Sequence, residues 1–408
     1  MSHTKGRSSR GTWSVRLPAL LLFPVLASCA GPSQTPEGGP AGGEGLVAAE
    51  NNHPLRPALQ AVVDSFHRSG SFPGVSAAIS LPDGSVIAVT AGEADTVRHL
   101  PMSPEGLMLQ GSVGKTYFAA LAMHLLGEGA LDLEARVSEY LGRHDWYSRI
   151  PNASGITVRH IMTHTSGVMR YEFKPAFTTD LTADPDKHWQ PEELLSYVLD
   201  EDASFAPGEG WEYSDTNFIL LAMILEEITG DSCYEMIQER FLSPLGLAET
   251  VPSDSRTISG LIQGYAGPQN PFGGTDEVLL PDGRFVINPQ FEWAGGGFAS
   301  TPRDLARWAR ALYTGRAFEP SLLSVMLEGV PARLGPGSRY GLGVILTDTP
   351  AGPAQGHSGF FPGYLTEMAY FPDLDLAGAI QVNTSVGQAL GRSPKSVLVE
   401  LVQAAAGQ

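Results

Sequence analysis

Residues 112–129 read SVGKTYFAALAMHLLGEG and join a helical pattern to a reactive pair at its start. The apolar side chains on one side of the predicted helix are Phe118, Leu121, Ala122, Leu125 and Leu126. Ser112 and Lys115 are three positions apart, so on a helix they share a face and the amine lies next to the hydroxyl. A helix N-terminus adds a positive field and free N–H groups. The stretch therefore fits a nucleophilic serine whose proton is taken by a lysine, although by itself the spacing also fits a capped surface helix.

Around this stretch the chain begins and ends with strand patterns. Residues 75–94 contain two apolar runs around Pro82-Asp83-Gly84, which predicts a β-hairpin. Near the C-terminus, residues 340–346, 366–372 and 376–384 predict three further strands. We therefore expect an α/β (α+β) fold: an antiparallel sheet of about five strands, built from both ends of the chain and flanked by helices, with a mostly helical lobe inserted between them.

Helical patterns account for much of the remaining sequence. They fall near residues 59–66, 157–163, 191–200, 216–228, 234–242, 300–315 and 393–404. Ser300 is the expected N-cap of the helix that follows it, and Pro302 lies near its first turn. Residues 252–292 show no sustained period, and because long loops inside compact domains are usually functional, we expect this one to shape the substrate pocket.

The N-terminus has the composition of an export signal. Four basic residues precede an apolar run over 17–26, which is too short for a comfortable membrane span. The following Leu26-Ala27-Ser28-Cys29 resembles a bacterial lipobox, in which Cys29 is lipidated, although an ordinary cleavage site is the alternative. Residues 30–50 are rich in Gly, Pro, Ser and Glu, as flexible tethers are. We predict a signal peptide over 1–28, a tether over 29–52 and a folded domain over 53–408, with its α/β part at about 53–105 and 290–408 and its helical lobe at about 106–289.

The composition excludes nucleic acid as a partner and gives little support for a metal site. Acidic residues outnumber basic ones by 44 to 26, giving a net charge of −18, so the chain has no broad attraction for nucleic acid. Cys233 is the only cysteine besides Cys29, and we expect it to be buried beside a helix. His160 and His164 have a spacing that can bind zinc, but no catalytic Glu follows, so we predict no metal and no cofactor.

Two later segments give the Ser112–Lys115 pair a context. Residues 211–230, WEYSDTNFILLAMILEEITG, place Tyr213 and Asp215 on a turn before an apolar helix, and residues 356–372, GHSGFFPGYLTEMAYFP, place His357-Ser358-Gly359 at the start of a strand. In this order the three elements resemble the signatures of the penicillin-recognising serine hydrolases, which include class C β-lactamases, D-Ala-D-Ala carboxypeptidases, esterases and D-aminopeptidases. Similar supporting segments occur at 131–141, 156–167, 207–217, 244–247 and 294–308, so the resemblance covers roughly residues 55–405.

The resemblance implies a role for each matching residue. Ser112 would attack the substrate carbonyl, Lys115 would accept its proton, and Tyr213 would relay protons to the leaving group and activate the deacylating water. The backbone N–H groups of Ser112 and Phe360 would form an oxyanion hole. His357 would hold the place of the third-motif cation. The matching substrate-binding positions are Ser358, which would hydrogen-bond a carboxylate, and Gly359, which would let the substrate approach.

Asp215 departs from the family pattern, in which asparagine is commoner. An ionised carboxylate can only accept hydrogen bonds, so it would pair with Lys115 or receive a substrate ammonium or hydroxyl. The departure disfavours amide-bearing β-lactams and leads us to expect that Asp215→Asn raises acylation by penicillins. Arg333 and Arg339 precede the third motif; either would suit a substrate carboxylate, but a solvated surface role is the simpler interpretation.

The resemblance implies an acyl-serine hydrolase, with D-Ala-D-Ala carboxypeptidase or a related D-amino-acid peptidase as the leading activity. The alternatives are a class C-like β-lactamase, a carboxylesterase, or a non-catalytic envelope binding protein on the same fold. We expect a peptide or small-molecule substrate, contact with the membrane only through a lipid anchor, and a location in the bacterial cell envelope.

Overall fold

The computed structural model describes residues 52–268, 270–271 and 276–407. The predicted signal peptide, Cys29 and nearly all of the predicted tether lie outside the described residues. Within the described part of the chain, no helix is both long enough and apolar enough to cross a membrane.

A nine-stranded antiparallel sheet forms the centre of the folded unit, in the order β3-β2-β1-β12-β11-β10-β9-β8-β7. The strands are β1 (Gly74–Ser80), β2 (Val86–Asp95), β3 (Leu100–Pro101), β7 (Val330–Pro331), β8 (Arg339–Tyr340), β9 (Ile345–Thr349), β10 (Gly352–Phe361), β11 (Tyr364–Phe371) and β12 (Leu376–Val382). β1 pairs with β12 from Val75 opposite Val382, which joins the two ends of the chain. This confirms the predicted fold class. The five longest strands, β1, β2, β10, β11 and β12, are the five that span seven to ten residues.

The prediction was wrong about the strands around the third motif. Residues 340–346, predicted as one strand, contribute to the short β8 and β9, because the chain turns between them at Gly343, which has a φ of 76°. The third long C-terminal strand is instead β10, and His357-Ser358-Gly359 lies inside it rather than at its start. The apolar alternation of this strand is interrupted by Pro353, Gly356 and Gly359. Pattern analysis of the sequence therefore did not predict it as a strand.

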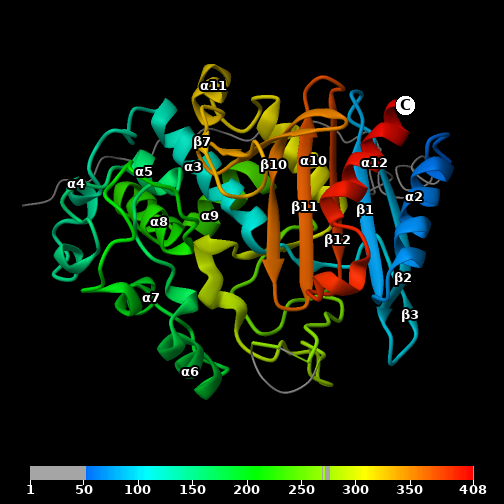
Figure 1. Ribbon diagram of the computed structural model, residues 1–408, viewed down its shortest axis with the longest axis horizontal. Coiled ribbons are helices and arrows are strands. Elements are labelled where there is room, and N and C mark those ends of the chain that lie inside the picture. Colours follow the sequence, from blue (N-terminus) through cyan, green and yellow to red (C-terminus); the bar gives the residue numbers. More distant parts are fainter. Residues whose placement is uncertain (1–51, 269, 272–275, 408) are drawn as a thin grey trace, which may run out of the picture. The chain divides into compact units, whose positions relative to one another are not determined.

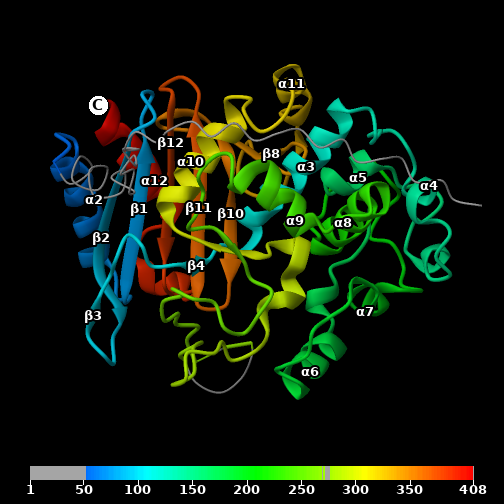
Figure 2. The ribbon, with the colours of Figure 1, turned by 180° about the vertical axis from the view of Figure 1, so that it is seen from behind.

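Helices cover both faces of the sheet (Figures 1 and 2). α2 (Arg56–Ser69) and α12 (Pro394–Ala406) pack on one face, and α10 (Pro302–Tyr313) packs on the other, against β1, β11 and β12. The N-cap of α10 is Thr301, whose side chain accepts from the Asp304 N–H, and not the predicted Ser300. Ser300 is instead the last residue of β6 (Phe298–Ser300), which lies between β4 (Met108–Leu109) and β5 (Val251–Pro252) in a small second sheet.

The segment between β3 and β7 supplies the helical part, which lies beyond β10 in both ribbon views. Its helices are α3 (Lys115–Gly127), α4 (Val137–Leu141), α5 (Val158–Met162), α6 (Pro175–Ala183), α7 (Pro191–Leu195), α8 (Asp215–Thr229) and α9 (Cys233–Ile237), and α9 continues into a π turn, Gln238–Leu242. A short helix, α11 (Leu323–Met326), follows α10.

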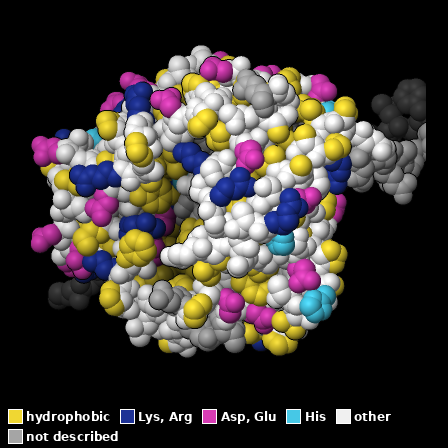
Figure 3. Space-filling model, turned by 45° about the vertical axis from the view of Figure 1, so that its right-hand side comes forward, with side chains coloured by type: hydrophobic (Ala, Val, Ile, Leu, Met, Phe, Trp, Pro, Cys, Tyr) yellow, Lys and Arg dark blue, Asp and Glu magenta, His cyan; other side chains and the backbone are white. Residues whose placement is uncertain are grey.

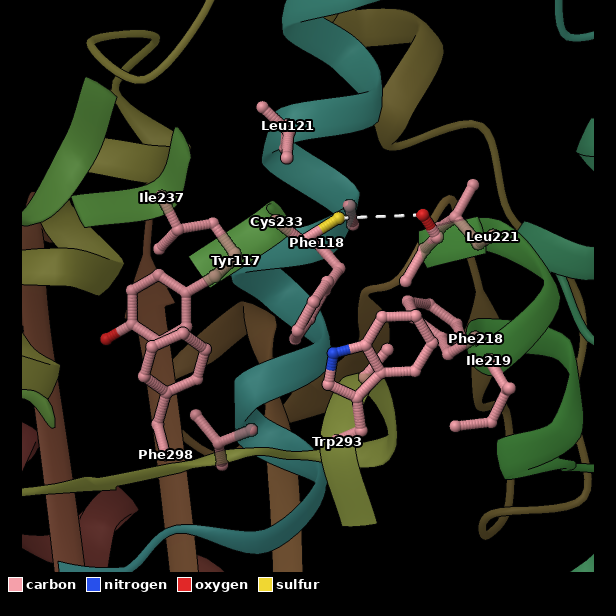
Figure 4. Close-up of a cluster of buried hydrophobic side chains, with 14 of the residues drawn as sticks. Tyr117, Phe118, Leu121, Phe218, Ile219, Leu221, Cys233, Ile237, Trp293 and Phe298 are labelled. Atoms are coloured by element: carbon pink, nitrogen blue, oxygen red, sulfur yellow. Dashed lines mark hydrogen bonds between the residues drawn. The ribbon is translucent and has the colours of Figure 1, made fainter. Parts of the chain in front are cut away.

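Helix α3 is the buried axis of this part, and it fixes the position of the Ser112–Lys115 pair. Figure 4 shows side chains of α3, α8 and α9 packed together with Trp293 and Phe298. Trp308 Nε1 donates to Thr116 Oγ1 at 2.8 Å, and its ring stacks on Tyr117 at a centroid distance of 4.4 Å. Because α3 is surrounded by side chains on all sides, its first turn is held rigidly.

Cys233 lies in the same core. Its thiol is buried, contacts the Ala222 carbonyl oxygen at 3.6 Å, and has a pKa raised well above its ordinary value by burial. The raised pKa keeps Cys233 in the unreactive thiol form, so it behaves as an apolar core residue.

Candidate active site

Ser112 lies on a single 3-10 turn, Gly111–Gly114, that leads directly into α3. Lys115, the first residue of α3, is fully buried, and its Nζ donates to Ser112 Oγ at 3.1 Å. Nζ also donates to the Gly295 carbonyl oxygen and forms an ion pair with Asp215. The structure therefore brings the predicted serine and lysine together and adds two further partners to the lysine.

Asp215 begins α8 and is held between two cations. Its Oδ1 contacts Lys115 Nζ, and its Oδ2 accepts from Arg170 Nη2 at 3.1 Å. Burial acts to raise the pKa of Asp215, but Lys115, a hydrogen bond with Glu172 and Arg170 outweigh it and hold the pKa well below its usual value. Of the alternatives that the sequence left open, the structure has the carboxylate paired with Lys115, and with Arg170 as a second cation.

Arg170 and Glu172 are members of the site that the sequence did not single out. Arg170 Nε donates to Glu172 Oε1, so the guanidinium links two acidic residues. Burial and the neighbouring Asp215 raise the pKa of Glu172 well above its ordinary value. The raised pKa favours the neutral form of Glu172, which reduces the repulsion between two neighbouring carboxyl groups.

Tyr213 lies two residues before Asp215, and its ring lies beside the amine of the Ser112–Lys115 pair. Its ring centroid is 5.0 Å from Lys115 Nζ and 4.3 Å from the ring centroid of His164. Within the described residues its buried hydroxyl makes no hydrogen bond. Burial, together with Asp215, raises the pKa of Tyr213 well above its ordinary value, and the nearby Ser112 hydroxyl offsets only part of this shift. Tyr213 is therefore a neutral phenol with its proton available.

His357 lies near this group, with a ring centroid 6.1 Å from that of Tyr213. Its Nδ1 lies 2.7 Å from the Ser358 carbonyl oxygen, which can only accept, so Nδ1 carries the proton and Nε2 accepts from Tyr340 Oη at 2.9 Å. Burial, with the positive charge of Lys115, lowers the pKa of His357 to about 3. His357 is therefore a neutral imidazole at neutral pH that contacts Ser358 and Tyr340, and its place as the third-motif residue stays a prediction.

The second half of β10 lies directly against the serine turn. β9 pairs only with Gly352–Gly356 of β10, so the rest of that strand edge faces Gly111–Gly114. A Cβ at Gly359 would lie 1.9 Å from the Gln110 carbonyl oxygen, so only glycine allows this approach. Ser358 and Phe360 are exposed on this strand. The backbone of Phe360 thus lies beside the turn that carries Ser112, as the predicted oxyanion hole requires.

Glu292 lies beneath the site in the 3-10 segment Pro289–Gly295 and accepts from the Gly297 N–H at 3.1 Å. Burial raises the pKa of Glu292 from 4.5 to about 8, against the opposing effect of Lys115. Because the folded pKa lies above the unfolded one, the stability that the neutral carboxyl provides is complete below pH 4.5 and is lost as the pH rises through 8.

We therefore expect Glu292→Gln to stabilise the protein at neutral and basic pH. An uncharged amide escapes this loss, which is on the order of 3 kcal/mol by pH 7 at 1.36 kcal/mol per pKa unit. Urea unfolding of both proteins at pH 4.5, 7 and 8.5 measures the effect. The two should be nearly equally stable at pH 4.5, and a variant that gains nothing relative to wild type at pH 8.5 would contradict the burial of a neutral carboxyl.

A cleft of about 870 Å³ opens beside Tyr213. It is lined by residues of three segments, Met169–Lys174, 204–213 and the β7–β8 connection, the last through Arg333. Phe173, which is 70% exposed, and Trp211 provide apolar surface in it. Figure 3 shows a face that is hollowed left of its centre, with hydrophobic, Lys and Arg side chains around the hollow. No described residue of 252–292 lines this cleft, so the expectation that this loop shapes the substrate pocket stays a prediction.

Sequence analysis considered two arginines as carboxylate-binding candidates and two histidines as zinc-binding candidates, and the structure places the members of each pair differently. Arg333 lines the cleft, whereas Arg339 donates to the Gly329 carbonyl oxygen. His164 Nδ1 accepts from the Ser214 N–H at 3.3 Å and from Asn217 Nδ2 at 3.1 Å, so His164 supports the turn that carries Tyr213. His160 Nδ1 accepts from the Thr157 N–H at 3.2 Å and caps α5.

The described residues therefore bring together most of the predicted site. Ser112, Lys115, Tyr213, Asp215 and His357, which span some 250 positions of sequence, lie in one cluster of contacts. The residues that sequence reasoning missed are Arg170, Glu172, Glu292 and Tyr340. His164 was considered only for its spacing to His160, and its role in supporting the Tyr213 turn was not predicted. His164 and Glu292 flank or belong to segments that support the family resemblance, at 156–167 and 294–308, but no periodicity or motif spacing pointed to Arg170, Glu172 or Tyr340.

Known proteins resemble this chain over most of its length. The sequence pattern of the Beta-lactamase family matches residues 59–400. Penicillin-binding protein 4* of Bacillus subtilis (strain 168) is 29% identical over 71% of this chain and 66% of its own length. D-aminopeptidase of Brucella anthropi is 27% identical over 81% of this chain and 60% of its own length. Esterase EstB of Burkholderia gladioli is 27% identical, covering 75% of this chain and 83% of the esterase. The chain thus spans less than two thirds of the first two relatives.

Solved structures share the fold. The D-stereospecific amidohydrolase from a Streptomyces species has a TM-score of 0.71 at 26% identity, covering 86% of this chain and 98% of that one. The D-amino acid amidase from Ochrobactrum anthropi SV3, complexed with L-phenylalanine amide, has a TM-score of 0.74 at 24% identity, covering 86% and 99%. Because the family pattern matches residues 59–400, which is nearly the whole described chain, the chain belongs to the Beta-lactamase family of serine hydrolases.

Proposed function

We propose that this protein hydrolyses amide bonds that follow a D-amino acid, in D-peptides or D-amino acid amides, through an acyl-serine intermediate. The observation that carries the proposal is the contact of Lys115 Nζ with Ser112 Oγ at 3.1 Å, beside a neutral Tyr213 at the wall of an open cleft. The substrate class is supported by relatives named D-aminopeptidase and D-stereospecific amidohydrolase.

In this mechanism Ser112 attacks the carbonyl carbon and Lys115 receives the hydroxyl proton. The backbone N–H groups of Ser112 and Phe360 stabilise the oxyanion. Tyr213, a phenol with no hydrogen-bond partner among the described residues, gives its proton to the leaving nitrogen and later takes one from the deacylating water. His357, being neutral, orients β10 through Ser358 and Tyr340 rather than binding an anion.

The test combines covalent labelling with a comparison of substrates. A fluorophosphonate and a fluorescent penicillin are offered to the wild type and to Ser112→Ala, and turnover is then compared for D-phenylalanine amide, its L enantiomer, nitrocefin and a p-nitrophenyl ester. We expect labelling that depends on Ser112 and a preference for the D-amide. Preferred turnover of nitrocefin would instead favour a β-lactamase, and preferred turnover of the ester would favour a carboxylesterase, in line with the relative named Esterase EstB. No labelling and no turnover would leave a non-catalytic binding protein.

Arg333 gives the cleft a substrate preference that can be measured. Arg170 is paired with Asp215 and Glu172, and Lys174 pairs with Glu201 at 3.0 Å. Arg333 lines the same cleft as Tyr213, the proposed proton donor to the leaving group, so a leaving group with a carboxylate would meet the guanidinium.

We expect Arg333→Ala to raise KM about tenfold for a D-dipeptide with a free carboxylate, in keeping with about 1.5–3 kcal/mol for a hydrogen bond to a charged group. KM for the corresponding D-amino acid amide should not change. Arg316→Ala, which removes an exposed arginine after α10, is the matched control. An equal rise in KM for both substrates would show that Arg333 does not recognise the carboxylate.

A further inference from the structure

His164 contacts the chain on both sides of Tyr213. Its backbone carbonyl oxygen accepts from the Glu212 N–H at 3.1 Å, and its side-chain Nδ1 accepts from the Ser214 N–H at 3.3 Å. The two residues next to Tyr213 are therefore fixed to a single residue of a distant segment. The imidazole ring also lies against the phenol ring, at a centroid distance of 4.3 Å.

These hydrogen bonds define the protonation state of the imidazole. A backbone N–H can only donate, so Nδ1 presents its lone pair to Ser214 and the ring proton lies on Nε2. Asn217 Nδ2 is a second donor to Nδ1 at 3.1 Å, and its orientation is fixed because Asn217 Oδ1 accepts from Ser166 Oγ at 2.6 Å. The ring is fully buried, and burial together with the positive charge of Lys115 lowers its pKa well below the ordinary value, so His164 is neutral at neutral pH.

The backbone of His164 has a conformation that few residues adopt. Its φ of 60° lies in the left-handed region, which histidine and asparagine enter more readily than branched or bulky residues do. Such conformations persist where the surrounding structure enforces them, and they cluster at functional sites. In this conformation the carbonyl oxygen and Nδ1 of His164 both reach the segment 212–214.

We propose that His164 is the positioning residue for the leaving-group proton donor, holding the Tyr213 phenol where its proton reaches the departing nitrogen. This inference rests on the proposed function, in which Tyr213 gives that proton. The Tyr213 hydroxyl has no hydrogen-bond partner among the described residues, so the phenol must be aimed through its backbone and its ring. His164 contacts both, and of the described aromatic rings around the phenol its imidazole is the nearest.

A positioning role has a signature that a general loss of stability lacks. Release of an amide nitrogen needs a proton, whereas release of p-nitrophenolate does not. For both kinds of substrate kcat/KM covers the steps up to formation of the acyl-enzyme, so the later part of Tyr213 in deacylation does not enter the comparison. A misplaced phenol should therefore lower kcat/KM for an amide and spare kcat/KM for an ester with the same acyl group.

The test measures kcat/KM for D-phenylalanine amide and for the p-nitrophenyl ester of D-phenylalanine. The decisive variants are His164→Leu and His164→Asn, whose side chains have nearly the same shape but of which only asparagine offers an acceptor in place of Nδ1. We expect His164→Leu to lower kcat/KM for the amide about 100-fold, the low end of a general-acid contribution, and that for the ester less than about threefold. His164→Asn should keep the amide value within about tenfold of wild type.

The matched control is His160→Leu. It also removes an Nδ1 that accepts a backbone N–H, in this case that of Thr157 at the start of α5, and it should leave the amide-to-ester ratio unchanged. Equal losses for amide and ester in His164→Leu, or an amide value within about threefold of wild type, would overturn the proposal. An amide value in His164→Asn as low as in His164→Leu would overturn it as well.

Two further variants keep the test decisive. If circular dichroism shows that His164→Leu does not fold, His164→Gly takes its place with the same expected ratios, because glycine adopts a φ of 60° without strain. Tyr213→Phe removes the phenol itself and should lower the amide-to-ester ratio at least as far as His164→Leu does. A wild-type ratio in Tyr213→Phe would refute the proton donor of the proposed function and the inference with it, whereas a lowered ratio in Tyr213→Phe alone would overturn only the positioning role of His164.

Discussion

Replacing Lys115 with methionine is expected to abolish acylation and to destabilise the protein strongly. The ammonium group is fully buried and is the contact between Ser112, Asp215 and Gly295. Without it Ser112 loses its proton acceptor, which costs about 100-fold to 10,000-fold in rate. Asp215 then remains buried with only one of its two cations, and breaking a buried ion pair in this way costs about 3–5 kcal/mol. Labelling by a fluorophosphonate and urea unfolding at pH 7 measure the two effects.

The double variant Lys115→Met with Asp215→Asn distinguishes the two effects. Removing both charges leaves no uncompensated carboxylate, so stability should recover most of the loss, while acylation should stay abolished. Because the pKa of Asp215 is lowered by folding, its stabilising contribution exists above its ordinary value of 3.8 and is lost as the pH falls, so the single variant should approach wild type in acid. Lys187→Met is the control: it breaks a partly exposed pair with Glu193 at 3.1 Å and should cost less than about 1 kcal/mol. A single variant as stable as wild type would contradict a buried pair.

The fold was largely predictable because its elements carry local signals. Short local patterns indicated the β1–β2 hairpin, helix α8 and, through Pro302, the start of helix α10. Each of these elements is present in the structure. β10 was missed as a whole strand because its glycines serve close backbone contact and not burial of side chains. Local pattern reasoning fails where the packing partner is distant in sequence, as Gln110 is from Gly359.

Site residues that belong to a motif could be predicted from the sequence. Residues that are in the site because they balance a buried charge could not. Ser112, Lys115 and Tyr213 follow from spacing and resemblance. Arg170 balances the buried charge of Asp215 and also pairs with Glu172, and such a partner can come from any segment that passes nearby. The neutral state of His357 likewise depends on burial and on Lys115, neither of which its own sequence neighbours reveal.

Replacing Gly114 with alanine is expected to be one of the most damaging single-methyl changes in the chain. Gly114 lies in the serine turn with a φ of −58°, a conformation that alanine adopts readily, so the backbone itself does not require glycine. A Cβ there would, however, lie 1.7 Å from the Gly296 carbonyl oxygen. Gly296 is itself closely packed, since a Cβ added there would lie 2.2 Å from Glu292 Oε1. The added methyl group must therefore push apart the start of α3 and the Gly295–Gly297 backbone.

The displacement should affect stability and catalysis together, since Lys115 donates to the Gly295 carbonyl oxygen. We expect a loss of about 3 kcal/mol or more, beyond ordinary overpacking, and acylation slowed at least about 100-fold through misplacement of Lys115. Urea unfolding and fluorophosphonate labelling of Gly114→Ala measure both quantities. Gly387→Ala is the matched control, because a Cβ at Gly387 meets no atom within 4 Å. If Gly114→Ala instead unfolds and labels like this control, α3 and the glycine segment do not meet as closely as the catalytic contacts of Lys115 require.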